Sequence, residues 1–232
     1  MSLRIGFDMD GVLADFGGAF RAVEQRLFPD ASGLPAGQPE NEAARTAADP
    51  PDAPAKPADN PHEEYRRRAA IWSEIRSTPN FWTTLAPLEA DAVRRVHELM
   101  LRHRWEVFFI TQRPATDGDT VQRQTQRWLV TQGFDLPSVL VIAGSRGAAA
   151  AALRLDYHVD DNTRNCLDVM SAAGSKVILV VGGSDQTIAM ARKMRMATVS
   201  SIGQCLDLLD QVSEAQSNPT LLERLATLVG WN

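Results

Sequence analysis

The chain has 232 residues, of which 44% are hydrophobic, and a formal net charge of −5. This length allows one sizeable hydrophobic core with room for a small insertion. The acidic balance argues against a nucleic acid polymer as a partner, because surfaces that bind one carry an excess of Lys and Arg. The sequence shows neither a signal peptide nor the roughly 20 consecutive apolar residues of a membrane span, so we expect a soluble, cytoplasmic protein that does not contact a membrane.

Short apolar runs alternate with amphipathic stretches along most of the chain. We predict strands over residues 4–7, 106–110, 139–142, 157–159, 176–181 and 197–199. We predict helices over residues 16–28, 62–76, 93–102, 118–132, 145–154, 162–173, 184–194, 202–214 and 221–228. The alternation is typical of an α/β fold, a Rossmann-like three-layer sandwich in which helices cover both faces of a mostly parallel sheet.

The alternation is interrupted by a long region between the first and second predicted strands. Within it, residues 29–61 are rich in Pro, Ala, Gly and Asp and contain almost no large apolar residues. Such a segment cannot bury much surface, and we predict a mobile loop. We interpret residues 16–88 as a small helical cap that carries this loop. Residues 1–15 and 89–232 would form the core domain.

Polar residues stand at the carboxyl ends of three predicted strands. Asp8 and Asp10 follow the first, Thr111 follows the second, and Asp160-Asp161 follow the fourth. We expect them to converge, because ligands of open parallel sheets bind at this edge. Two carboxylates so close in sequence repel each other and lose hydration, and a bound divalent cation would offset both costs. The pattern therefore predicts a metal-assisted catalytic site.

Four separated motifs make the chain resemble the haloacid dehalogenase superfamily of phosphohydrolases. They are Asp8-Met-Asp-Gly-Val, the Thr111 that closes Val107-Phe-Phe-Ile-Thr, Ser145-Arg146-Gly147, and Asp160-Asp161. The resemblance implies a haloacid dehalogenase-like core, a small phosphate ester as substrate and Mg²⁺ as cofactor. It also implies that Asp8, Asp10, Asp160 and Asp161 hold the metal, while the sequence leaves open which residue of the last pair is the inner ligand.

The same resemblance assigns roles to the remaining groups. Asp8 would be the nucleophile that forms an aspartyl-phosphate. The Asp10 side chain would protonate the leaving oxygen and then activate water, while its backbone carbonyl contacts the metal. Gly11 suits the turn that brings backbone N–H groups to the phosphoryl oxygens, and Thr111 would donate its hydroxyl to one of them.

Arg146 stands where the family normally has a lysine. Arginine keeps the positive charge and can grip two oxygens, but it is bulkier. Two interpretations stay open: Arg146 replaces the lysine and binds phosphate, or it only begins a helix and the site lacks its cation. Arg113, in Gln112-Arg113-Pro114, is the other candidate cation and would bind substrate. Its alternative is a solvated loop arginine.

A narrower resemblance concerns the substrate. The segments Asp8-Met-Asp-Gly-Val-Leu-Ala-Asp-Phe16 and Phe81-Trp-Thr-Thr-Leu-Ala-Pro-Leu88 resemble the 5′(3′)-deoxyribonucleotidase family, although Thr-Gln-Arg-Pro departs from its second motif. The resemblance implies nucleoside monophosphates as substrates, with Phe16 and Trp82 stacking on the base. The alternatives are that these aromatic residues pack the cap's own core and that the substrate is a sugar phosphate or another small metabolite. A catalytically weak, phosphate-binding regulatory protein and a homodimer also stay open.

Overall fold

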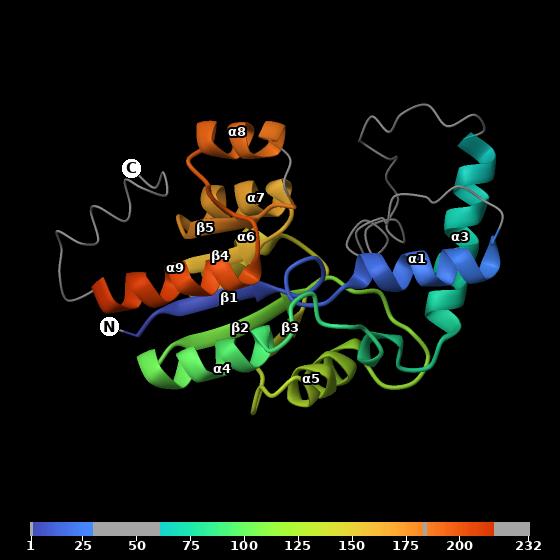
Figure 1. Ribbon diagram of the computed structural model, residues 1–232, viewed down its shortest axis with the longest axis horizontal. Coiled ribbons are helices and arrows are strands. Elements are labelled where there is room, and N and C mark those ends of the chain that lie inside the picture. The colour runs from blue at the N-terminus through green and yellow to red at the C-terminus, as the bar shows by residue number, and fades with distance from the viewer. Residues whose placement is uncertain (1, 30–60, 183–184, 216–232) are drawn as a thin grey trace.

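A single parallel sheet organises the computed structural model, which describes residues 2–29, 61–182 and 185–215 (Figure 1). Its strand order is β3-β2-β1-β4-β5-β6, and every neighbouring pair is parallel. The strands are β1 (Arg4–Asp8), β2 (Glu106–Thr111), β3 (Val139–Val141), β4 (Tyr157–Asp160), β5 (Lys176–Val180) and β6 (Ala197–Val199). The motif Asp8-Met-Asp-Gly-Val thus begins at the end of β1, a central strand that is paired on both sides.

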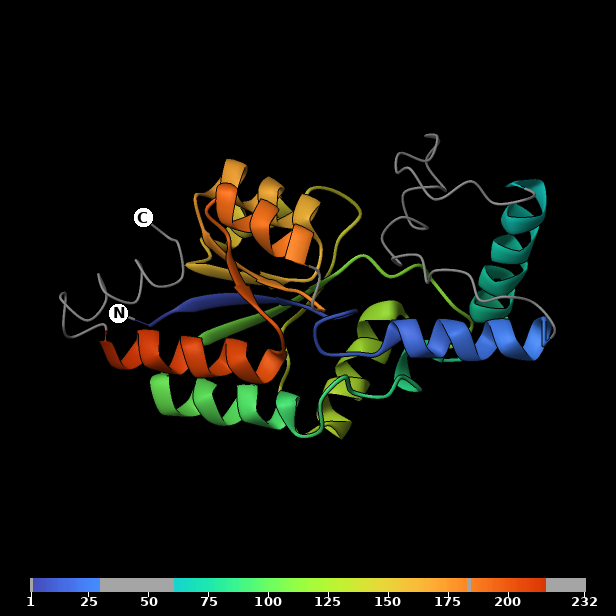
Figure 2. The ribbon, with the colours of Figure 1, turned by 45° about the horizontal axis from the view of Figure 1, so that its top comes forward.

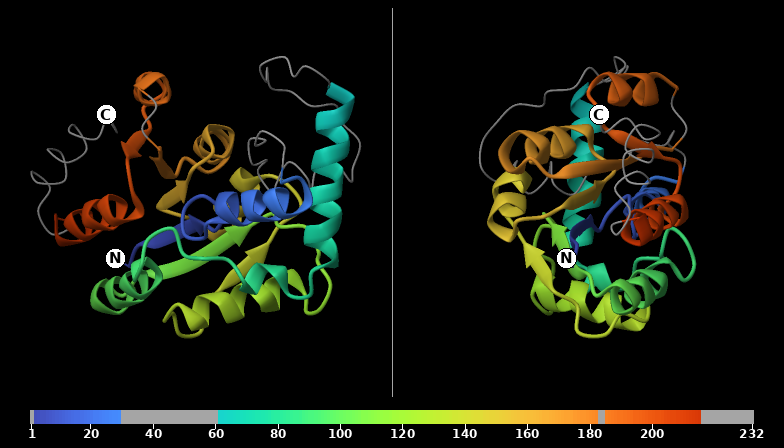
Figure 3. Two further views of the ribbon diagram at one scale, coloured as in Figure 1. Left: turned by 45° about the vertical axis from the view of Figure 1, so that its right-hand side comes forward. Right: turned by 90° about the vertical axis from the view of Figure 1, so that its left-hand side faces the viewer.

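Helices cover both faces of this sheet (Figures 2 and 3). One layer contains α4 (Ala92–His103), α5 (Val121–Thr131) and α9 (Ile202–Ala215). The other contains α6 (Arg146–Leu153), α7 (Thr163–Ala173) and α8 (Asp185–Lys193). Successive strand residues point to opposite faces, so Phe109 joins the hydrophobic cluster of the first layer and Ile110 that of the second. The predicted three-layer α/β sandwich is confirmed.

Three strands extend one residue further than the sequence predicts. Asp8, Thr111 and Asp160 are the last residues of β1, β2 and β4 rather than the first residues of loops. Asp8 pairs in register with Ile110, and Asp160 pairs with Leu179, so the parallel ladder continues through the carboxylates. The polar side chains are therefore fixed by the sheet itself.

A pair of helices lies beyond the carboxyl ends of the strands. These are α1 (Phe16–Leu27) and α3 (Pro61–Ser77), and the short helix η1 (Phe81–Thr83) leads back toward α4 (Figure 1). The Asp15 side chain caps α1 by accepting a hydrogen bond of 2.7 Å from the Gly18 N–H. Most of the predicted loop 29–61 and the predicted helix 221–228 lie outside the described residues. No helix of the described chain has the length and apolar composition of a membrane span.

Candidate active site

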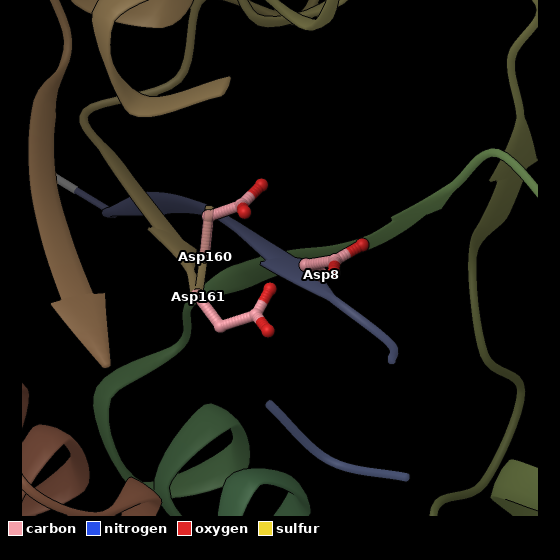
Figure 4. Close-up of side chains that lie close together, drawn as sticks. All are labelled: Asp8, Asp160 and Asp161. Atoms are coloured by element: carbon pink, nitrogen blue, oxygen red, sulfur yellow. The ribbon is translucent and has the colours of Figure 1, made fainter. Parts of the chain in front are cut away.

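Three carboxylates gather at the carboxyl edge of the sheet (Figure 4). Asp8 ends β1, Asp160 ends the neighbouring strand β4, and Asp161 follows directly. Each side chain offers an oxygen atom, and the three oxygens lie within 4.8 Å of one another. Asp8 and Asp160 are buried, with 1% and 0% of their surface exposed. We call these three residues the acid cluster.

Arg146 brings a positive charge to the acid cluster. It is the first residue of α6, whose N-cap Ser145 accepts a hydrogen bond from the Ala148 N–H. The buried guanidinium donates through Nη2 to Oδ1 of Asp8 at 2.6 Å, and its Nε lies 3.5 Å from Oδ2 of Asp160. Arg146 therefore starts a helix and also contacts the predicted nucleophile, as its interpretation as a lysine replacement requires.

The pKa values of Asp8 and Asp160 are both shifted from the usual aspartate value. Burial raises the pKa of Asp8 well above its usual value; Arg146 opposes this shift, while the neighbouring carboxylates add to it. Burial also acts to raise the pKa of Asp160, but Arg146, the nearby His158 and a backbone hydrogen bond outweigh burial and hold the pKa below its usual value. The pKa values of Asp8 and Asp160 are thus shifted in opposite directions.

His158 supports Asp160 in a way that the sequence analysis missed. Its Nε2 lies 3.0 Å from Oδ2 of Asp160, and both side chains are fully buried. Oδ1 of Asp160 accepts a hydrogen bond of 2.8 Å from the Asn162 N–H. Residues two apart on a strand share a face, so the spacing of His158 and Asp160 within one predicted strand was the signal for this pair.

Gly11 is required by the approach of Asp161. Its φ of +84° is a backbone conformation that favours glycine, and a Cβ there would stand 2.0 Å from Oδ2 of Asp161. The Gly11 N–H donates to the carbonyl of Ala14 at 3.1 Å rather than pointing to an open site. Its role in the structure is to make space for Asp161, and phosphate binding by Gly11 stays a prediction.

Thr111 ends the strand that neighbours β1. It ends β2, whose preceding residue Ile110 pairs with Asp8 across the parallel ladder. Its backbone carbonyl accepts a hydrogen bond of 2.9 Å from the Ile142 N–H, which fixes the strand end against the segment after β3. Thr111 therefore ends the strand next to the one that Asp8 ends, and donation by its hydroxyl to a phosphoryl oxygen stays a prediction.

Arg113 forms a second buried ion pair, with Asp10. Its Nε and Nη2 donate to Oδ2 and Oδ1 of Asp10, each at 2.7 Å, and Nη1 donates to Oγ1 of Thr125 at 3.1 Å. The guanidinium carbon lies 4.8 Å from the ring centroid of Trp82. Only 3% of Arg113 is exposed, so the alternative of a solvated loop arginine is wrong.

The aromatic residues near the site pack against one another. Phe16 stacks on Trp72 with ring centroids 5.5 Å apart and contacts Trp82 at 5.7 Å, while Phe20 packs edge-on against Trp72. We call these four residues the aromatic cluster. Phe16 and Trp82 are 3% and 0% exposed, so neither ring presents an open face to a base in this structure. Base stacking by Phe16 and Trp82 stays a prediction.

The donor set of the acid cluster suits Mg²⁺. The ion prefers carboxylate and other hard oxygen ligands, and Asp8, Asp160 and Asp161 supply three such groups from a rigid strand edge. With Asp10, Arg113 and Arg146 included, four acids face two arginines, which leaves a formal charge that one divalent ion would neutralise. The Asp10 carboxylate is engaged by Arg113 and lies outside the acid cluster, so only its backbone carbonyl stays a predicted ligand.

Comparison with known proteins extends the fold assignment. No family model and no curated protein sequence matches the chain. Solved structures do match it: a predicted β-phosphoglucomutase from Thermotoga maritima (TM-score 0.53, 16% identity), an L-2-haloacid dehalogenase (0.53, 15%) and a predicted phosphoglycolate phosphatase from Haemophilus somnus (0.52, 16%). Each match covers 90% of this chain and 98–100% of the other. At this level of identity the similarity shows the fold alone: the chain has the fold of haloacid dehalogenase-like hydrolases.

Proposed function

We propose that the chain is a Mg²⁺-dependent phosphomonoester hydrolase that acts through an aspartyl-phosphate, with nucleoside monophosphates as substrates. One observation carries the proposal: the buried carboxylate of Asp8 stands 2.6 Å from a guanidinium nitrogen of Arg146 and within 4.8 Å of oxygens from two further acids. A phosphate ester is anionic and repels a carboxylate nucleophile. The site therefore needs fixed positive charge at that point.

The reaction divides into two displacements at phosphorus. In the first, an Asp8 oxygen attacks, the bond between phosphorus and the leaving oxygen breaks, and a proton from Asp10 neutralises the leaving oxygen. In the second, water loses a proton to Asp10 and attacks the aspartyl-phosphate. The bond from phosphorus to Asp8 then breaks, and inorganic phosphate leaves. Arg146 binds a single oxygen of Asp8, so the other oxygen can act as the nucleophile.

Asp8, Asp160 and Asp161 would hold the ion, which would supply positive charge against the phosphoryl oxygens. Arg146 would share this task from the first turn of α6, and the Thr111 hydroxyl would donate to a phosphoryl oxygen. Arg113 adds a second positive charge through its ion pair with Asp10.

The helices α1 and α3 would act as a cap over this site. The two chain segments that connect them to the sheet run side by side: the Asp15 N–H donates to the Ala86 carbonyl at 2.8 Å, and the Leu88 N–H donates to the Leu13 carbonyl at 2.9 Å. These contacts coincide with the predicted boundaries of a cap at residues 16–88. They support its treatment as an insertion in a core of residues 1–15 and 89–232.

A sugar phosphate or another small hydroxylated metabolite is the second candidate substrate. A cavity of about 460 Å³ borders Gly11 and Asp161 and is lined further on by Glu89 and by the hydroxyl-bearing residues Ser200 and Ser201. Val12, Leu88, Val180, Val181 and Ile202 also line this cavity, and its hydroxyl groups suit a polar leaving group. The aromatic cluster, in contrast, is closed in this structure.

A phosphate-release assay with Mg²⁺ tests both candidates. The panel contains ribo- and deoxyribonucleoside monophosphates, sugar phosphates and p-nitrophenyl phosphate. Asp8→Asn protein, purified identically, controls for contaminating phosphatases. Higher kcat/KM for nucleotides supports the first candidate, and higher kcat/KM for sugar phosphates supports the second. If the wild-type protein releases no more phosphate than Asp8→Asn from any compound, the proposed function is wrong.

A further inference from the structure

Arg113 holds the side chain of Asp10 in one plane. Both oxygens of the carboxylate accept a hydrogen bond of 2.7 Å from the same guanidinium, through Nε and Nη2. A planar fork that meets a planar carboxylate at two points allows no rotation of the carboxylate without loss of both contacts. The direction in which the remaining lone pairs of Asp10 point is therefore set by Arg113.

Arg113 is itself fixed from two further sides. Its Nη1 donates to Oγ1 of Thr125 on α5, and its guanidinium lies over the ring of Trp82. The indole Nε1–H of Trp82 donates to the carbonyl of Pro114 at 3.0 Å, so the same aromatic residue also holds the backbone that follows Arg113. The guanidinium has a defined position before any substrate arrives.

These contacts do not fit direct binding of the substrate phosphate by Arg113. All three guanidinium nitrogens of Arg113 already donate to protein oxygens, and the side chain is buried. Arg146, in contrast, contacts the nucleophile itself. The two arginines therefore have different tasks, and the task of Arg113 is exerted through Asp10.

We infer that Arg113 is a positioning residue, which orients the Asp10 carboxylate so that its proton transfer reaches the leaving oxygen and the attacking water. This inference rests on the proposed function, in which Asp10 moves that proton. It assigns a purpose to the Thr-Gln-Arg-Pro sequence that follows β2. Arg113 of that segment orients the carboxylate of Asp10.

The test compares substrates that need the proton with one that does not. Departure of p-nitrophenolate requires no protonation, whereas phenyl phosphate and benzyl phosphate have increasingly basic leaving groups. The ratio kcat/KM reports the steps up to release of the leaving group. Arg113→Lys keeps the charge without the fork, and Arg113→Met removes both. We expect kcat/KM to fall by about a hundredfold for benzyl phosphate and by much less for p-nitrophenyl phosphate.

Two further variants keep the result interpretable. Thr125→Val removes one contact of Arg113 without touching Asp10, so it tests the inference with a milder change if Arg113→Met does not fold; we expect a smaller loss with the same leaving-group dependence. Arg102→Met changes an exposed arginine of α4 that pairs with Asp210, and we expect no change in any ratio.

The outcomes separate the inference from the proposed function. Equal losses for all three esters in Arg113→Lys and Thr125→Val, or a gain for benzyl phosphate, would overturn the positioning role while leaving the phosphatase assignment intact. If wild-type protein hydrolyses none of the esters, the proposed function fails and the inference falls with it.

Discussion

The two carboxylates of the first motif each pair with a buried arginine, but the two pairs are built differently. One oxygen of Asp8 accepts a hydrogen bond from Arg146. Arg146 also approaches Asp160 and thus contacts two members of the acid cluster. Both oxygens of Asp10 accept hydrogen bonds from Arg113. The guanidinium of Arg113 in turn lies over the ring of Trp82, which belongs to the aromatic cluster. One pair belongs to the acid cluster, and the other contacts the aromatic cluster.

This difference separates two demands of phosphoryl transfer. A nucleophile needs one oxygen free to attack, and its partner should stabilise the charge that moves onto phosphate. A group that transfers protons twice needs a fixed direction, because its geometry matters in both steps. The contact pattern around each carboxylate matches the demand that our proposal places on it.

The largest expected effect is that of Asp8→Asn. The amide has nearly the same shape but cannot attack phosphorus, so we expect kcat/KM to fall by at least about a thousandfold. The fold should persist, because the substitution removes one negative charge from a crowded cluster. Circular dichroism and steady-state kinetics with p-nitrophenyl phosphate measure both quantities.

Asp10→Asn provides the matched comparison. With a good leaving group, this variant should still form the aspartyl-phosphate but hydrolyse it slowly, and a rapid-quench experiment should show a burst of p-nitrophenol. No burst is expected from Asp8→Asn. If both variants behave alike in the burst experiment, the division of roles between the two carboxylates is wrong.

Mg²⁺ should stabilise the protein in a pH-dependent way. The raised pKa of Asp8 means that metal-free protein is stabilised by Asp8 below the usual aspartate pKa and loses this contribution as pH rises through the raised value. Mg²⁺ binds the ionised carboxylate, so its effect should grow over the same pH range. At a concentration a hundred times Kd the gain is about 2.7 kcal/mol. Asp160 acts in the opposite sense: its lowered pKa stabilises the protein above the usual aspartate pKa, and this contribution is lost as pH falls through the lowered value.

Thermal denaturation with Mg²⁺ or EDTA at a series of pH values measures this effect. Asp8→Asn should bind the ion more weakly, and the rise of the Mg²⁺-induced shift in Tm with pH should disappear. A shift that is the same at every pH, or one that survives unchanged in Asp8→Asn, would show that the ion binds elsewhere.

Arg146→Lys should reduce activity by about tenfold, because lysine keeps the charge but loses the fork. Arg146 bonds to Asp8 and to the carbonyl of Ile110 and also approaches Asp160, and one ammonium group cannot reproduce this arrangement. The measurement is kcat/KM for the best substrate of the panel. A large gain in rate would instead indicate a decayed site, as expected of a weak phosphate-binding protein.

Much of this site could be predicted from the sequence because it follows the sheet. Asp8, Thr111 and Asp160 end strands whose apolar runs are unambiguous, and the carboxyl ends of neighbouring parallel strands must meet. Arg146 could be placed because it begins a helix after a strand. These residues are positioned by regular structure, for which local pattern is a sufficient guide.

The partners of Arg113 could not be predicted in this way. Arg113 lies in a loop and reaches Asp10, which is 103 positions away in the chain, and its anchor Trp82 belongs to a different segment again. The direction of a loop side chain depends on packing that no periodicity records. The burial of Phe16 has the same origin: a single aromatic residue at the start of α1 reads equally as a ligand contact or as core.

Phe16→Leu should distinguish these two readings through a small effect. If Phe16 only packs the aromatic cluster, the variant loses aromatic contacts and stability falls by about 1 kcal/mol. The KM values for nucleoside monophosphates and for p-nitrophenyl phosphate should then change in parallel, since neither substrate touches the ring. A selective rise in KM for the nucleotides would show that the ring contacts the base and that the cluster opens when substrate binds. Because Phe16 touches Trp82, which lies over Arg113, such an opening would also disturb Asp10, so the selective rise should be accompanied by a loss of kcat for substrates with basic leaving groups.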